Sequence, residues 1–243
     1  ADKAAAKAYV QQKGVAVIPG AANVTPAQLP AVAAAIGFPL MLKASLGGGG
    51  KGMRLIQSAA ELQQDYHLIR EEARQAFLSD AVYLEKYLPH ARHIEIQILV
   101  DHAGHIQIFG DRECSLQVNH QKIIEESPAS CLTDVARQQL YQATERVLQG
   151  LAYCGVGTLE FLYAQGQFYF LEMNTRLQVE HGVTELTTGK DLVVQQIAVA
   201  AGATIPTRQL AFQGHAIEVR LNANGAGDLQ QFQLPTTVRI ETG

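Results

Sequence analysis

With 243 residues, 47% of them hydrophobic and 17% charged, the sequence is long enough for one large domain or two smaller ones with buried cores. A net charge of -4 gives no reason to expect nucleic acid as a partner, and no apolar run approaches the ~20 residues of a membrane helix. The three cysteines show no CxxC spacing, which disfavours a disulfide framework or a zinc site and favours a reducing, cytoplasmic compartment.

Helices and strands are both predicted along the whole chain. In order, the patterns indicate a helix at 2–13, a strand at 15–18, a helix from Thr25-Pro26 to Gly37, strands at 38–44 and 53–56, a helix from Ser58 to Phe77, strands at 81–88, 93–100 and 105–109, a polar loop at 111–126, a helix from Thr133 to Tyr153, strands at 156–163 and 167–171, a helix at 188–201 and a strand at 215–222. Most strands come in pairs joined by short turns. This favours an α+β fold with antiparallel sheets over a Rossmann array.

A glycine-rich loop, Ser45-Leu46-Gly47-Gly48-Gly49-Gly50-Lys51-Gly52, joins the strands at 38–44 and 53–56. Such a loop lets backbone amides approach an anion closely, and phosphate is the usual one. It is not a P-loop, because Gly52 stands where Ser or Thr must follow the lysine. With the cationic Lys43 before it, the loop is interpreted as a flap over phosphate, and the alternative is a flexible linker.

A run of polar residues follows the aromatic strand at 167–171. If the backbone stays extended, one face carries Glu172, Asn174, Arg176, Gln178 and Glu180. The neighbouring strand places Glu160 close to opposite Glu172 in a hairpin. Two carboxylates at ~4 Å repel by about 4 kcal/mol at an effective dielectric of ~20, so a proton, an arginine or a divalent cation must offset the repulsion. The alternative is a solvated sheet face with mixed charges.

Taken together, these motifs resemble the ATP-grasp superfamily and, within it, biotin carboxylase. The similar stretches cover nearly the whole chain: Lys43-Ala44-Ser45 with its glycines, 92–97, His120-Gln121-Lys122, Glu160-Phe161-Leu162 and 172–181. The resemblance implies an ATP-grasp domain over 1–206, a lid subdomain at about 15–87 and the start of a C-terminal domain over 207–243. It also implies a fragment without the family's N-terminal domain and most of its C-terminal domain.

The resemblance implies an activity as well. ATP and bicarbonate would carboxylate biotin on a carrier protein through carboxyphosphate, the first half-reaction of a biotin-dependent carboxylase. Mg²⁺ or Mn²⁺ would be the cofactor. The partners would be a biotin carboxyl carrier domain and a carboxyltransferase, and the full-length enzyme would be a homodimer.

The resemblance further implies roles for individual residues. The metal ligands would be Glu160, Glu172 and Asn174. ATP would contact Lys3, Lys43, Gly48, Gly49, Glu85, Lys86, Leu88, His93, Gln117 and His120. Bicarbonate would bind Lys122, Arg176, Gln178 and Val179. Catalysis would use Glu180 as the general base together with Arg176, Lys122 and Arg220, the last stabilising the biotin enolate.

The sequence also departs from the family pattern. Val118 and Asn119 replace two arginines, Gly182 replaces a proline, and Asn224-Gly225 stands in place of Glu-Asp-Pro. Two alternatives therefore stay open: another ATP-grasp ligase, such as a carbamoyl-phosphate synthetase half, and a catalytically silent ATP-binding fragment. The set from Arg176 to Glu180 argues against the first. ATP binding without bicarbonate-dependent turnover would favour the second.

Overall fold

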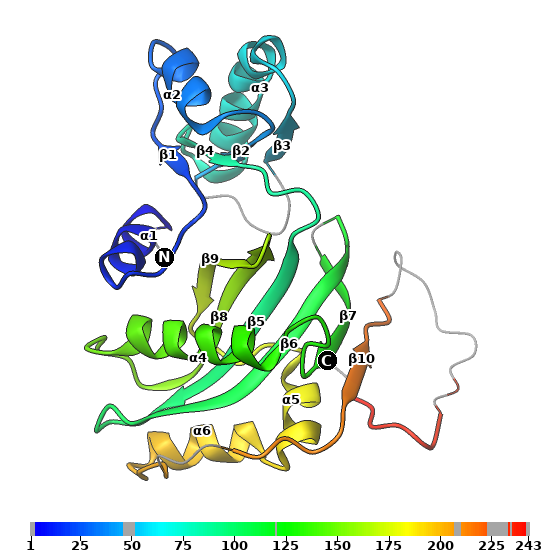
Figure 1. Cartoon of the computed structure of the whole chain (residues 1–243). Helices are drawn as coiled ribbons and strands as arrows, with labels where there is room; N and C mark the ends of the chain where they lie inside the picture. Colours follow the sequence, from blue (N-terminus) through cyan, green and yellow to red (C-terminus); the bar gives the residue numbers. More distant parts are fainter. Residues whose placement is uncertain are drawn as a thin grey trace.

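The computed structural model describes residues 3–45, 52–119, 121–206, 210–222, 233 and 235–241. In this part of the chain the strands form two antiparallel sheets, one in the order β1-β4-β2-β3 and one in the order β10-β7-β6-β5-β8-β9. Figure 1 shows the smaller sheet with its helices at the top and the larger sheet below it. The predicted α+β class with antiparallel sheets is confirmed.

The smaller sheet and two helices form one packed unit. Its elements are β1 (Gly20–Ala22), α2 (Leu29–Ile36), β2 (Leu40–Ala44), β3 (Met53–Ile56), α3 (Ala59–Phe77) and β4 (Val82–Lys86). Apolar side chains of the sheet pack against the helices, with Leu40, Leu42 and Ile69 fully buried. The predicted cap of α3 is confirmed, because Ser58 accepts a hydrogen bond from the amide of Glu61.

The larger sheet carries the main core. Its strands are β5 (Arg92–Val100), β6 (Ile106–Val118), β7 (Gln121–Ser127), β8 (Gly155–Ala164), β9 (Gln167–Asn174) and β10 (Ala216–Val219). The helices beside it are α1 (Lys3–Gln12), α4 (Asp134–Leu148), α5 (His181–Thr188) and α6 (Leu192–Ala200). Ile94, Ile96 and Ile98 of β5 pack with Leu140 of α4 in one core cluster. None of the described helices is long and apolar enough to cross a membrane.

The region predicted as a polar loop at 111–126 is the clearest error. β6 continues to Val118 and pairs with β7, so the region is a hairpin in the sheet. Its polarity has a physical reason: Gln117, Lys122 and other polar residues line a cavity, so the inner face is not apolar. The alternating pattern of a strand on an apolar core is therefore absent.

The extended backbone expected through 172–180 was also wrong in part. β9 ends at Asn174, the chain then turns, and α5 begins at His181 with Glu180 as its N-cap residue. The prediction that alternate side chains of 172–180 share one face of a strand therefore holds only for Glu172 and Asn174, which lie within β9. α5 itself was not predicted.

The other differences are smaller shifts of element ends. The predicted strand at 15–18 contains only an isolated bridge from Val17 to Phe170, and the strand lies at Gly20–Ala22 instead. The helix expected to open at Thr25-Pro26 begins at Leu29. The helix expected to reach Tyr153 ends at Leu148.

Candidate active site

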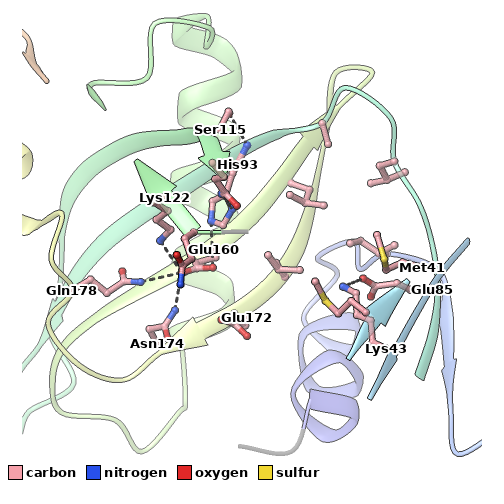
Figure 2. Close-up of a pocket in the computed structure, with 18 of the residues that line it drawn as sticks. Met41, Lys43, Glu85, His93, Ser115, Lys122, Glu160, Glu172, Asn174 and Gln178 are labelled. Carbon is pink, nitrogen blue, oxygen red and sulfur yellow. Dashed lines mark hydrogen bonds and ion pairs between the residues drawn. The ribbon is translucent and has the colours of Figure 1, made fainter. Parts of the chain in front are cut away.

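A cleft of about 1190 Å³ opens between the two sheets (Figure 2). Proteins bind drug-sized ligands in cavities of ~300–1,000 Å³, so a nucleotide fits this volume. The predicted site residues that line it are Lys43, Glu85, Lys86, Leu88, His93, Gln117, Lys122, Glu160, Glu172, Asn174, Arg176, Gln178, Val179, Glu180 and Arg220. Gly48, Gly49 and His120 lie outside the described residues, and only the helical backbone is described for Lys3.

Glu160 and Glu172 face each other across the β8–β9 hairpin, as their spacing indicated. Asn174 Nδ2 and Gln178 Nε2 donate to Glu160 Oε1 over 2.7 and 3.0 Å. No other described residue forms a hydrogen bond or ion pair with the Glu172 side chain, which lies beside Asn174 in Figure 2. The pKa of Glu160 is lowered: burial raises it, and the contact with His93 and the positive charge of Lys122 outweigh that effect.

Glu160 on β8 and Glu172 and Asn174 on β9 line the same cleft with oxygen-bearing side chains. Two carboxylates and one amide, from Glu160, Glu172 and Asn174, are the ligand chemistry that suits Mg²⁺ or Mn²⁺. Among the described residues, ligand atoms lie within 4.8 Å of one another in two other groups: His93 with Glu95 and Glu160, and Glu95 with Cys114 and Glu180. We favour the oxygen set, because Glu95 is already neutralised by arginine and lysine while Glu172 has no described partner.

Arg112 on β6 is fully buried and organises the polar face of the large sheet. Its Nε and Nη2 donate to Glu95 Oε2 over 3.2 and 3.0 Å. Further hydrogen bonds go to Gln97, Thr158, Gln178 and Thr184. Burial disfavours a charged Glu95, but His93, Arg112 and Lys122 lower its pKa well below the usual value.

Lys122 on β7 joins three carboxylates. It ion-pairs with Glu95, donates to Glu160 Oε1 over 3.3 Å and donates to Glu180 Oε1 over 2.6 Å. Burial lowers the pKa of Lys122, but the three negative charges raise it well above the usual range. His93 Nε2 lies 3.1 Å from Glu95 Oε1 and 3.3 Å from Glu160 Oε2. Burial lowers the pKa of His93, but the two carboxylates outweigh that effect and raise it to about 9.

Glu180 is buried between two cations at one end of the cleft. Lys122 Nζ donates to Glu180 Oε1 over 2.6 Å, and Arg220 Nη2 donates to Glu180 Oε2 over 2.7 Å. Arg220 also ion-pairs with Glu125, whose pKa is raised because burial outweighs the arginine charge. Glu218 lies directly opposite Glu125 in the β10–β7 pairing, and burial together with the Glu125 charge raises its pKa to about 7.

At the opposite end, Glu85 accepts from two lysines. Lys7 Nζ donates to Oε2 over 2.8 Å, and Lys43 pairs with Oε1. Lys86 donates to the backbone oxygens of Gly37 and Phe38 over 2.9 and 2.7 Å. Lys43 and Lys86 therefore both lie at the cleft wall and also bind protein groups.

Three of the residues predicted to bind bicarbonate have different surroundings. Arg176 and Val179 are exposed, and the only described hydrogen bond of the Arg176 side chain goes to Leu177 O over 3.2 Å. Gln178 is buried and connects Arg112 with Glu160. The Arg176 guanidinium lines the cleft, is exposed and has N–H groups beyond the one that binds Leu177 O, so it can bind an anion.

Several residues of the site were missed by sequence reasoning: Lys7, Glu95, Arg112, Glu125 and Glu218. The signal for Glu95 was present, since it alternates with buried isoleucines on β5. Arg112 could have been recognised as a buried arginine only if 111–118 had been interpreted as a strand, because it lies in the buried part of β6. Lys7 had no signal, because its partners lie on a distant strand.

Comparison with known proteins shows the family to which this chain belongs. The family model described as "Carbamoyl-phosphate synthase L chain, ATP binding domain" matches residues 2–208. The biotin carboxylase of Allochromatium vinosum is 44% identical over 255 residues, covering 99% of this chain and 57% of the relative. A pyruvate carboxylase component of Methanothermobacter thermautotrophicus is 44% identical over 226 residues, covering 91% of this chain and 46% of the relative.

Solved structures are similar over most of the chain. A Campylobacter jejuni biotin carboxylase crystallised with a β,γ-ATP ligand has a TM-score of 0.86 and 43% identity, covering 90% of this chain and 50% of that one. The biotin carboxylase domain dimer of Hydrogenobacter thermophilus 2-oxoglutarate carboxylase, in complex with MgADP, ADP and bicarbonate, has a TM-score of 0.86 and 38% identity, covering 90% and 49%. The chain thus spans about half the length of these four proteins.

Proposed function

Because the chain belongs to the family of the carbamoyl-phosphate synthase L chain ATP-binding domain and is a homologue of biotin carboxylases, we propose that it supplies the ATP-dependent biotin carboxylation site of a biotin-dependent carboxylase. The relatives at 44% identity are carboxylase components, which favours this reaction over carbamoyl phosphate synthesis. The observation that carries the proposal is Glu180, held between Lys122 and Arg220 in the same cleft as the Glu160–Glu172 pair.

ATP would lie between the two sheets, with its phosphates toward β8 and β9. Lys43 and Lys86 supply cationic side chains along the wall, and His93 lines the wall as well. Glu160, Glu172 and Asn174 would hold Mg²⁺ or Mn²⁺, which neutralises phosphate charge when bound. Lys3, Gly48, Gly49, Glu85, Leu88, Gln117 and His120 complete the proposed nucleotide contacts.

Bicarbonate would bind beside Glu180. Arg176 offers a planar guanidinium to a planar anion, and Lys122, Gln178 and the Val179 backbone complete the proposed contacts. Glu180 would accept the bicarbonate proton. A carbonate oxygen would then attack the γ-phosphorus as ADP leaves, giving carboxyphosphate.

Biotin would meet Arg220, the cation beside Glu180, where enolate charge develops. The biotin would arrive on a carrier domain, and a carboxyltransferase would take the product. We also propose homodimer formation by the full-length enzyme, a lid at about 15–87 within an ATP-grasp domain over 1–206, and a C-terminal domain starting at 207.

The test is steady-state ATP hydrolysis by the chain with Mg²⁺ and bicarbonate, with and without free biotin. Biotin should stimulate turnover, and Glu180→Gln should abolish the bicarbonate-dependent part while nucleotide affinity stays unchanged. Glu145→Gln, an exposed substitution on α4, is the matched control and should behave like the unchanged chain. Nucleotide binding without any bicarbonate-dependent turnover, in this chain and in the full-length protein alike, would refute the proposed reaction and favour a silent ATP-binding module. Equal loss of binding and turnover in Glu180→Gln would refute its role as the base.

A further inference from the structure

Lys7 on α1 contacts the nucleotide cleft through one intermediary, Glu85. We propose that Lys7 is a positioning residue for Lys43: by staying on Glu85, it allows Lys43 to leave that carboxylate and bind the anionic part of the nucleotide. This inference rests on the proposed ATP site. Lys7 does not line the cleft, whereas Lys43 and Glu85 do.

The geometry is that of one buried carboxylate shared by two lysines. The Glu85 side chain is 5% exposed and the Lys7 side chain 10%, against 21% for Lys43. Lys7 Nζ also donates to the Tyr83 hydroxyl over 3.0 Å and lies 4.5 Å from the centroid of that ring. Lys7 is thus fixed by two neighbours in β4, while Lys43 is the more exposed of the two lysines.

The two lysines also differ in what holds their backbones. α1 packs against β9, and Val10 of α1 belongs to the main core of the large sheet. The Tyr9 hydroxyl donates to Val147 O over 3.0 Å, which fastens the helix to the end of α4. Lys43 is instead on β2 of the small sheet, next to the cleft. Lys7 therefore reaches from the body of the large sheet across to the small one.

Charge balance gives the arrangement a function. A buried carboxylate that loses its cation is strongly destabilised, so a lone Lys43 would be retained by Glu85 and withheld from phosphate. With Lys7 present, Glu85 keeps an ion pair after Lys43 turns away. The pKa values agree: burial opposes charge on both groups, yet the mutual attraction raises the pKa of Lys7, and Lys43 and Lys7 together lower that of Glu85.

The experiment is calorimetric titration with ATP and with adenosine, which lacks the phosphates. Lys7→Met should weaken ATP binding about ten-fold and leave adenosine binding unchanged. Lys7→Arg should bind ATP as tightly as the unchanged chain, because arginine keeps the positive charge at this position. Lys13→Met, which removes a lysine of the same N-terminal region that binds Gln149 O and not Glu85, is the matched control. In turnover, the ATP KM should rise while kcat stays constant.

A second pair of variants, both without the Glu85 carboxylate, separates the role of Lys7 from unfolding. Glu85→Gln and Lys7→Met/Glu85→Gln should bind ATP equally, since Lys7 acts only through the carboxylate. Unchanged ATP affinity in Lys7→Met, equal losses for ATP and adenosine, or a further loss in the double variant would each overturn the inference. Absence of ATP binding by the unchanged chain would instead overturn the proposed function on which the inference rests.

Discussion

Replacing Arg112 by methionine tests whether the polar face of the large sheet depends on one buried guanidinium. Arg112 is fully buried and its hydrogen bonds reach Glu95, Gln97, Thr158, Gln178 and Thr184. Glu95 would keep Lys122 and His93, so its charge would stay paired. The substitution would therefore mainly remove hydrogen bonds to the neutral acceptors Gln97, Thr158, Gln178 and Thr184.

Two amide oxygens, those of Gln97 and Gln178, would lose their partner without a replacement. Their amide nitrogens are fixed by bonds to Gly157 O at 2.9 Å and Glu160 Oε1 at 3.0 Å, so neither group can rotate to a new donor. An orphaned buried polar group costs ~1–3 kcal/mol. Two of them place the loss of unfolding free energy at about 4 kcal/mol, a large share of the ~5–15 kcal/mol of a typical protein.

The assay is urea unfolding followed by far-ultraviolet circular dichroism, because the chain has no tryptophan. Arg146→Met, an exposed cation on α4, is the control and should change the unfolding free energy by less than about 0.5 kcal/mol. Arg112→Lys should recover little, because an ammonium group cannot reproduce the planar fork. A loss below about 1 kcal/mol in Arg112→Met would refute the reasoning.

The remaining predictions concern three other positions. Glu172→Gln should weaken Mg²⁺-dependent ATP binding about ten-fold in a magnesium titration, and an unchanged magnesium dependence would rule out Glu172 as a ligand. Glu218 has its pKa raised from 4.5 to about 7, so its contribution to stability is complete below pH 4.5 and is lost as the pH rises to about 7. Glu218→Gln should remove this loss, worth ~1–2 kcal/mol after solvent screening, in urea titrations at pH 5 and 8; the same pH dependence in both chains would contradict the assignment. Gly110→Ala should cost ~2 kcal/mol or more by the same method, because a Cβ there would lie 2.1 Å from the Phe212 ring at a φ of +99°, and a neutral result would refute the close contact.

Local patterns predicted those parts of the site that depend on neighbouring residues. The Glu160–Glu172 pair follows from alternation along two strands joined by a short turn, and the structure has that pairing. The strands on either side of the glycine loop pair as expected, with Lys43 opposite Met53. In both cases the sequence separation is small, so few alternative registers exist.

The same patterns could not predict which segments, distant in the sequence, lie next to each other in the fold. The approach of Arg220 to Glu180 requires β10 to pair with β7, which no local rule specifies. α5 escaped prediction because the Glu180-His181 segment was interpreted as a continued strand. The partners of Arg112 come from several separate elements, and they become neighbours only after the sheet has formed.

The pairing of β10 with β7 has a consequence for protein synthesis. During synthesis Glu125 and Glu180 leave the ribosome before Arg220, the cation that they share. Until β10 emerges, β7 presents an open edge, and the two carboxylates lack that counter-charge. Hydration or proton uptake would stabilise them in the nascent chain, so this end of the cleft would assemble last.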